Sequence, residues 1–361
     1  MAISKNEAEL AKYIQEKCSK IGMATEIDRH GNVIARKRFS DGGIVLALNS
    51  HMDTVDIGKG WTKDPFGCEM ENTKMYGLGS GDCKGSIAGM LMAMEEIIAK
   101  EDQLKLKGEL VFTAVVQEEV QGERNKGTWK MIQDGFTADM TIVGEPTSLE
   151  ICRGGEGMAE VTVITEGIPV HASTAEDGVN AINAMVKIIC EINSKIKPGH
   201  SELLGNGSIC VGVIEGGTRS SVVPDKCVMK VSRFVVEGES RQQFCDQITE
   251  IIRNLQKTDP TLKATATCTY SSFAAVVPEN TPLVSCFKKA TKKVMGKEAR
   301  IVGLRAHFDS DFLINIAHIP CVVFGPGDLH RAHTADEWID VAEIAVAAKV
   351  YAETIIEAMK E

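Results

Sequence analysis

Apolar residues recur along the chain in two periods, which predict strands that alternate with helices. Residues 44–48 and 109–116 are short, nearly continuous apolar runs, as expected for strands buried on both faces of a sheet. Residues 139–143 form a third such run, whereas residues 6–21 place apolar side chains on one helical face. This alternation predicts an α/β fold built around a largely buried sheet.

The pattern changes at about residue 155. Residues 161–164 alternate between apolar and polar side chains, and the segments that follow predict the order strand, helix, strand, strand, helix, strand. That order is the ferredoxin-like, split βαβ unit. We therefore expect a mixed-sheet α/β/α domain of residues 1–154 and 275–361, with an inserted α+β domain of residues 155–274.

Side chains that can bind metal ions follow the three predicted buried strands. His51 ends the first strand, Glu118 and Glu119 follow the second, and Glu145 follows the third. The carboxyl-terminal edge of an open α/β sheet is where ligand sites form. Adjacent carboxylates at the end of a buried strand repel each other, and a bound cation would relieve that repulsion.

Two aspartates lie close to these positions in the sequence. Asp53 is two residues after His51, where its carboxylate could accept the second ring N–H of a metal-bound histidine. Asp82 ends a glycine-rich run before a predicted helix, where a helix N-cap is the alternative interpretation. The run does not match the phosphate-binding pattern G-x-G-x-x-G, because Asp82 occupies the third glycine position.

The overall composition narrows the class of partner. The formal charge of −10 argues against a nucleic-acid partner, which would need a basic face. The 11 cysteines contain no C-x-x-C pair, so neither a zinc ribbon nor a disulfide framework is indicated. The N-terminal residues lack a secretory signal, and no apolar run reaches the roughly 20 residues of a membrane helix. We expect a cytoplasmic protein with a small-molecule substrate and no membrane partner.

Together these residues suit a pair of divalent metal ions, zinc most readily, with cobalt or manganese as alternatives. The candidate ligands are His51, Asp82, Glu119, Glu145 and His333. Five blocks of the chain resemble, in order, the metallopeptidase and deacylase family of acetylornithine deacetylase, succinyl-diaminopimelate desuccinylase, aminoacylase and glutamate carboxypeptidase. These blocks are residues 51–55, 79–85, 118–119, 144–147 and 332–337.

The resemblance implies a role for each of these residues. His51 and Glu145 would hold one metal ion, Glu119 and His333 the other, and Asp82 would bridge the two. Asp53 would orient His51, and Glu118 would be the general base. The inserted domain would serve as a lid and homodimerisation domain, and its His171 would reach the partner's active site to stabilise the oxyanion.

The function implied is hydrolysis of the amide bond in a small N-acyl amino acid with a free carboxylate, by deacetylation or desuccinylation. Glu145 favours a deacylase, because the peptidase branches tend to carry aspartate in that block. A dipeptidase or aminopeptidase of the same family is one alternative. A non-catalytic protein that binds a metal or another ligand is an alternative of another class, and a nucleotide-binding enzyme is a third.

The substrate-binding residues are less defined by the resemblance. The family's lid asparagine and its Asp-x-Arg pattern are replaced here, with Ser221 and Ser232 at the corresponding positions. Arg233, Arg219 and Arg305 are therefore candidates to anchor the substrate carboxylate. Glu156 stands where related chains often carry a basic residue, and an acidic group there would select a cationic side chain.

Overall fold

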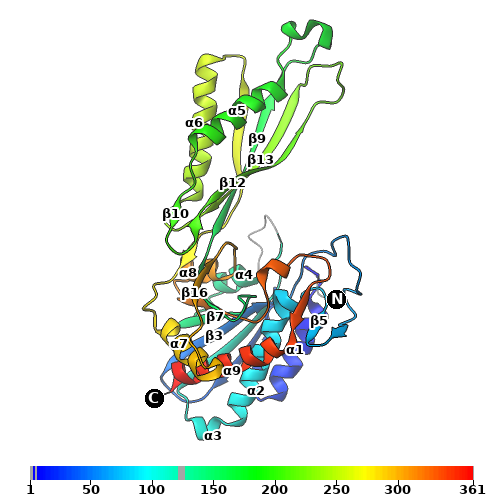
Figure 1. Cartoon of the computed structure of the whole chain (residues 1–361). Helices are drawn as coiled ribbons and strands as arrows, with labels where there is room; N and C mark the ends of the chain where they lie inside the picture. Colours follow the sequence, from blue (N-terminus) through cyan, green and yellow to red (C-terminus); the bar gives the residue numbers. More distant parts are fainter. Residues whose placement is uncertain (1–2, 5, 121–126, 361) are drawn as a thin grey trace. The chain divides into compact units, whose positions relative to one another are not determined.

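The computed structural model describes residues 3–4, 6–120 and 127–360 of the chain (Figure 1). The chain forms two compact units. Unit 1 comprises Met1–Gly154, Val276–Leu304 and Phe308–Glu361, and unit 2 comprises Gly155–Ala275 and Arg305–His307. The segment Arg305–His307 was expected in the first domain but belongs to unit 2, where Arg305 contacts Glu156.

Unit 1 is built on a large mixed sheet with the strand order β1-β2-β6-β3-β7-β17-β8-β15, and β16 pairs with β8. Its central strands β6 (Gly108–Val115), β3 (Ile44–His51), β7 (Met140–Val143) and β17 (Cys321–Val323) run parallel. The flanking strands are β1 (Ala24–Ile27), β2 (Val33–Arg38), β8 (Ile151–Gly155), β15 (Ala275–Val276) and β16 (Ile301–Leu304). Antiparallel pairs β1–β2, β2–β6 and β17–β8 make the sheet mixed, as predicted.

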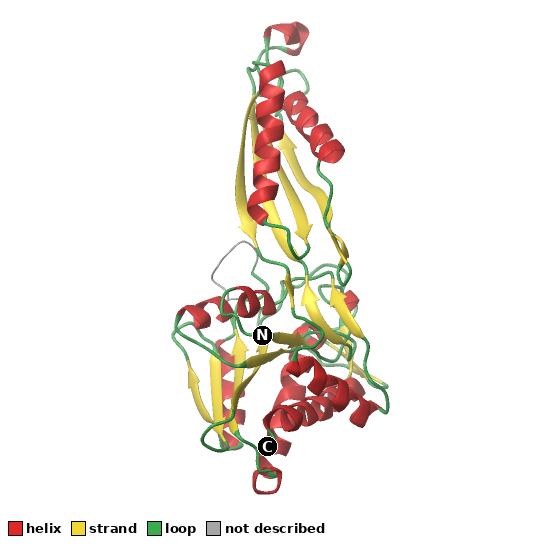
Figure 2. Ribbon diagram, turned by 90° about the vertical axis from the view of Figure 1, so that its left-hand side faces the viewer, coloured by secondary structure: helices red, strands yellow, loops and turns green. Residues whose placement is uncertain are grey.

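Helices cover both faces of this sheet because successive side chains of its buried strands point in opposite directions (Figure 2). Leu46 and Phe112 belong to a core that includes side chains of four helices. These helices are α1 (Ala8–Lys20), α2 (Gly85–Ala99), α7 (Pro282–Met295) and α9 (Val341–Met359). Ala47 and Val111 instead pack with Met131 of α4 (Gly127–Gln133). The predicted α/β/α architecture is confirmed.

Shorter elements complete unit 1. They are α3 (Glu101–Leu104), α8 (Ser310–Asn315), the turns η1 (Ser80–Lys84) and η3 (Leu329–Arg331), and a small sheet of β18 (Trp338–Asp340), β5 (Lys74–Tyr76) and β4 (Met70–Glu71). The apolar pattern of the sequence also predicts a helix over about residues 124–134; its first three residues lie outside the described residues, and α4 begins at Gly127.

Unit 2 contains an antiparallel sheet with the strand order β12-β13-β9-β14. Its elements are β9 (Gly157–Glu166), α5 (Ala181–Lys195), β12 (Ser208–Gly216), β13 (Lys226–Val235), α6 (Arg241–Thr258) and β14 (Lys263–Ser271). Val161 of β9, Ile188 of α5 and Phe244 of α6 share one core, so both helices pack against the sheet. This element order and pairing confirm the predicted ferredoxin-like topology.

Three short elements of unit 2 were not predicted: η2 (Ala172–Asp177), β10 (His200–Ser201) and β11 (Gly205–Asn206). Within the described ranges, no disulfide joins the cysteines. The helices in those ranges also include none with the length and apolar character needed to cross a membrane.

Candidate metal centre

The parallel strands of unit 1 deliver the candidate ligands to one edge of the sheet. His51 is the last residue of β3 and pairs in register with Val115, the last residue of β6. Glu118 and Glu119 follow β6, and Glu145 follows β7, which runs parallel to β3 on its other side. Because parallel strands end at the same edge, segments far apart in the sequence converge there.

The first cluster of donors contains His51, Asp82, Cys83 and Glu145, all of them buried. The Nε2 atom of His51 lies 3.0 Å from Asp82 Oδ1 and 3.8 Å from Glu145 Oε1. One donor atom from each of the four residues lies within 4.8 Å of the other three. Sequence reasoning included three of these residues and missed Cys83 as a member of the cluster.

The second cluster contains Asp82, Glu119 and His333. The Nε2 atom of His333 lies 2.8 Å from Glu119 Oε1 and 3.4 Å from Asp82 Oδ2. Asp82 therefore directs one carboxylate oxygen toward each histidine and belongs to both clusters. All five ligand candidates from the sequence lie within these two clusters.

Burial and hydrogen bonds shift the pKa values of the acidic and imidazole groups of this centre. Burial raises the pKa of Glu145 well above its ordinary value and raises that of Glu119 to about 7. Burial also opposes ionisation of Asp82, but hydrogen bonds from His333 and His51 hold its pKa well below the usual range. The contacts with Asp82 and Glu119 raise the pKa of His333 to about 10.

These shifts show that the centre favours positive charge next to its carboxylates. A divalent cation can replace the protons on the histidines and on the buried glutamates, because metal ligands bind in their deprotonated forms. Imidazole nitrogens with carboxylate oxygens are donors that zinc and related ions accept. The residues present thus fit two divalent ions that share the Asp82 carboxylate.

Asp53 contacts the backbone of the two glutamates that follow β6. Its carboxylate is buried and accepts hydrogen bonds from the backbone N–H groups of Glu118 (3.0 Å) and Glu119 (3.1 Å), and from the hydroxyl of Ser4 (2.5 Å). The Nδ1 atom of His51 lies 2.9 Å from the carbonyl oxygen of Asp53 and 3.5 Å from its carboxylate. Asp53 thus contacts His51, and the nearer acceptor is its backbone carbonyl.

Glu118 lies beside the ligands but belongs to neither cluster of donors. It is 8% exposed and is held by its backbone contact with Asp53. The preceding residue, Gln117, has φ of 60°, and His333 has φ of 61°, both in the left-handed region that non-glycine residues rarely adopt. Such conformations persist where the surrounding structure enforces them, which is common at functional sites.

Glu337 shapes the loop that carries Asp82, a role that sequence reasoning missed. Its carboxylate accepts hydrogen bonds from the backbone N–H groups of Gly79 (2.9 Å), Gly81 (2.9 Å) and Asp82 (3.1 Å). Gly79 has φ of 76°, and a Cβ there would lie 2.3 Å from the side chain of Thr54. The only sequence signal for Glu337 was its place at the end of the block that contains His333.

The arginine candidates lie in unit 2. Arg233 is 5% exposed, pairs with Glu239, and donates to Gln247 Oε1 (3.0 Å) and to the Lys197 carbonyl (3.2 Å). Its two terminal nitrogens thus serve partners inside its own unit, whereas its buried Nε has no hydrogen-bond partner among the described residues.

The other two arginines, Arg219 and Arg305, are exposed. The Nε atom of Arg305 lies 3.2 Å from the carboxylate of Glu156. Glu156 itself is buried, and this burial raises its pKa. Arg305 and Glu156, which the sequence offered as two separate candidates for substrate selection, therefore form an ion pair with each other.

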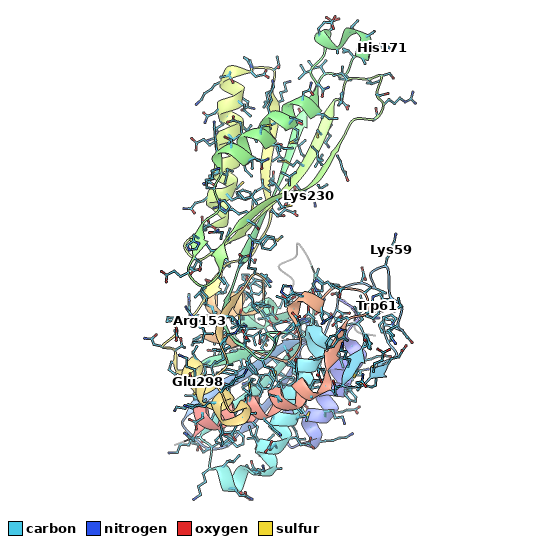
Figure 3. All side chains as sticks on the ribbon, viewed as in Figure 1. Lys59, Trp61, Arg153, His171, Lys230 and Glu298 are labelled. Atoms are coloured by element: carbon cyan, nitrogen blue, oxygen red, sulfur yellow. The ribbon has the colours of Figure 1, made fainter. Side chains whose placement is uncertain are left out.

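His171 is exposed and precedes η2 (Figure 3). Its Nδ1 atom lies 2.7 Å from the hydroxyl of Ser173 and accepts the backbone N–H of Ser173 at 3.2 Å. A backbone bridge to Val222 fixes the start of this loop. The imidazole orientation is therefore set by local contacts within unit 2.

The chain is similar in sequence to a family of metallopeptidases and to two deacylating enzymes. The model of peptidase family M20/M25/M40 matches residues 47–357. The chain is 28% identical to N-formyl-4-amino-5-aminomethyl-2-methylpyrimidine deformylase of Halalkalibacterium halodurans, over 96% of this chain and 88% of that protein. It is also 28% identical to acetylornithine deacetylase of Buchnera aphidicola, over 86% of this chain and 80% of that protein.

A solved structure shares the fold. The aminopeptidase PepT from Bacillus cereus has a TM-score of 0.80 at 23% identity, covering 99% of this chain and 94% of that chain.

Proposed function

Because the chain belongs to peptidase family M20/M25/M40, we propose that it is a dinuclear metallohydrolase that deacylates a small N-acyl amino acid. The observation that carries this proposal is the shared Asp82, whose two carboxylate oxygens face His51 and His333 in adjacent donor clusters. We infer zinc as the native ion from the mixture of nitrogen and oxygen donors, with cobalt and manganese as functional substitutes.

The protein residues divide the work of hydrolysis. His51 and Glu145 would hold one ion, Glu119 and His333 the other, and Asp82 both. When bound, the ions would polarise the scissile carbonyl and favour ionisation of the attacking water. Glu118 would take the proton of that water and pass it to the leaving amine nitrogen. Asp53 would keep Glu118 in position through the backbone contact described above.

We further propose that the chain works as a homodimer through unit 2 and that His171 acts in the partner's active site. Strand β12 is an edge strand of the unit 2 sheet, with Val213 41% and Ile214 50% exposed. An edge with unpaired backbone groups and apolar side chains favours pairing with another strand. With Nδ1 engaged by Ser173, His171 would present Nε2 to the developing oxyanion.

The preference for a deacylase rests on Glu145 and on the relatives named as a deformylase and a deacetylase. A dipeptidase or aminopeptidase activity of the same family is the second candidate, favoured by a peptidase fold neighbour. Arg219 and Arg305 are the proposed anchors for the substrate carboxylate because their side chains are exposed. Arg233 is the weaker candidate because its side chain is buried and both terminal nitrogens of its guanidinium already have partners.

A substrate panel tests this proposal. Purified chain, stripped of metal and reloaded with zinc, is assayed against N-formyl, N-acetyl and N-succinyl amino acids beside dipeptides with a free amino terminus. We expect zinc-dependent release of the amine from N-acyl substrates. Turnover confined to dipeptides would favour the peptidase alternative, and no turnover of any amide by the zinc-loaded chain would contradict the proposal.

A complementation experiment tests the role of His171. His171→Ala should lower kcat by about 10²–10³-fold, the range for losing one oxyanion donor, without changing metal content. His200→Ala is the matched control, because His200 is another exposed histidine of unit 2. Mixing His171→Ala with Glu118→Ala chains should restore activity, since one site of each heterodimer has both groups. Absence of recovery after verified subunit exchange would place His171 outside the partner's site.

A further inference from the structure

We propose that Cys83 supplies a fourth donor to the first cluster, which makes that site a closed, thiophilic one and leaves the second site open for exchange. The inference deepens the proposed function and rests on it. It concerns which of the two ions is held more tightly and which exchanges more readily.

The position of Cys83 carries the argument. Its sulfur, one ring nitrogen of His51 and one carboxylate oxygen each of Asp82 and Glu145 lie within 4.8 Å of one another. All four residues are buried, and Cys83 is 0% exposed. Zinc in closed protein sites takes four donors from cysteine, histidine and carboxylates. This cluster offers one nitrogen, one sulfur and two oxygens.

The chain also holds Cys83 firmly. It follows the shared Asp82 directly, in the loop whose backbone N–H groups are bound by Glu337. Its sulfur lies 2.9 Å from the hydroxyl of Ser50, which in turn lies 3.0 Å from the carbonyl oxygen of Gly144.

Ser50 would support a sulfur ligand. A hydroxyl has one proton, so Ser50 can donate either to Gly144 or to Cys83. While the Ser50 hydroxyl donates its hydrogen bond to the Gly144 carbonyl, the Cys83 thiol can donate to the Ser50 oxygen. Once the sulfur ligates an ion, the Ser50 hydroxyl can turn and donate to it. Such outer contacts orient metal ligands and tune the ion they bind.

The second cluster differs in both number of donors and exposure. It has three protein donors, Asp82, Glu119 and His333, and the His333 side chain is 52% exposed. Three protein ligands with one open position are typical of catalytic zinc sites, whereas four ligands are typical of structural ones. The first ion should therefore exchange slowly, and the second should exchange readily.

The sulfur donor also predicts a preference among metals. Thiolates favour zinc and cadmium, whereas oxygen-rich sites suit manganese and magnesium. The first site should thus prefer cadmium and zinc, and the second site, with oxygens and a single imidazole, should discriminate less.

Cobalt titration of the metal-stripped chain tests the proposal. The first equivalent of Co²⁺ should produce a thiolate-to-cobalt charge-transfer absorption, and the second should add only the weaker ligand-field bands. Cys83→Ser should lose the charge-transfer band and still bind cobalt. Cys152→Ser is the control that should keep the band, because Cys152 is another buried cysteine of unit 1 outside both clusters.

The outcomes separate this proposal from the proposed function. Binding of two cobalt ions by the unmodified chain without a charge-transfer band would overturn the role of Cys83 and leave the dinuclear hydrolase intact. Failure to bind cobalt at all would contradict both. Because the unmodified chain decides the question, an unfolded variant does not weaken the test.

Cadmium affinity gives a second readout that does not use activity. Cys83→Ser should weaken binding of the first Cd²⁺ by at least about 10–100-fold, the range seen when even an outer partner of a ligand is lost. Binding of the first Mn²⁺ should change much less. Equal losses for cadmium and manganese would overturn the proposed sulfur ligation.

Discussion

Two regions of the molecule bury charged side chains, and they balance these charges in opposite ways. In unit 2, the terminal nitrogens of Arg233 meet Glu239, Gln247 and the Lys197 carbonyl, so the chain itself supplies the counter-charge of the buried cation. In unit 1, the described residues of the metal centre gather an excess of acid. They are the carboxylates of Asp53, Asp82, Glu118, Glu119 and Glu145, the imidazoles of His51 and His333, and the ammonium of Lys84.

The difference teaches how to tell a structural cluster of charges from a functional one. Buried charge is costly unless it is paired. In a balanced cluster such as that of Arg233 the pairing comes from the chain, so no ligand is needed to account for it. With every carboxylate ionised and both histidines protonated, five negative charges would face three positive ones. Such a surplus points to cations from outside the chain.

The largest expected effect is on kcat, when the carboxylate proposed as the general base is removed. Glu118→Gln removes the general base without removing a metal ligand, so kcat should fall by about 10²–10⁴-fold. Metal content and thermal stability should stay near those of the unmodified chain. Steady-state kinetics with metal analysis on the same preparation checks this. Loss of bound metal in the variant would instead make Glu118 a ligand.

A matched pair of substitutions should change stability in opposite directions in the two regions. Glu239→Gln leaves the buried Arg233 without its counter-charge and should destabilise the chain by up to about 3–5 kcal/mol. Glu145→Gln removes a carboxylate whose pKa burial raises, so it should stabilise the metal-free chain while weakening metal binding. Denaturant unfolding of metal-free chains measures both values. The same sign for both substitutions would break the distinction between the two regions.

The smallest of these effects is a pH dependence confined to the metal centre. In the metal-free chain, Glu119 keeps its proton up to a pKa of about 7, and the unfolded chain loses it near 4.5. The native state binds more protons in that window, so stability falls as pH rises, by about 1.4 kcal/mol per pH unit for each such proton. Glu145, whose pKa is also raised, acts in the same direction.

Metal loading should remove this dependence because the ions displace the protons. The difference in Tm between loaded and metal-free chain should therefore widen as pH rises from about 5 to about 7. The lowered pKa values of Asp53 and Asp82 act below that window. A constant or narrowing difference in Tm would show that the acidic surplus does not carry protons in the metal-free chain.

Sequence reasoning predicted those features that depend on local patterns. Buried strands are visible as apolar runs, and a residue shortly after a run such as 44–48 is placed near the sheet edge by chain geometry. The sequence alone could therefore place His51 and Glu145 together, and β3 and β7 are indeed parallel neighbours. The ferredoxin-like unit was predictable for the same reason, since its alternation has a period of two.

The features that were missed depend on contacts between distant segments. Glu337 binds backbone groups of Gly79, Gly81 and Asp82 more than 250 positions earlier, and no periodicity encodes this. The membership of Cys83 in the first cluster likewise follows from how its loop meets β3. The burial of Arg233 could not be inferred either, because Glu239 and Gln247 contact it only once α6 and the residues just before it pack against the sheet.

The central claim is that Asp82 joins two metal sites, and counting bound ions tests it most directly. The metal-stripped chain is dialysed against zinc and analysed for zinc per chain, beside Asp82→Asn, Glu145→Gln and the exposed control Asp246→Asn. We predict two ions for the unmodified chain and the control, one for Glu145→Gln, and none for Asp82→Asn. Two ions retained by Asp82→Asn, or fewer than two in the unmodified chain, would contradict the account.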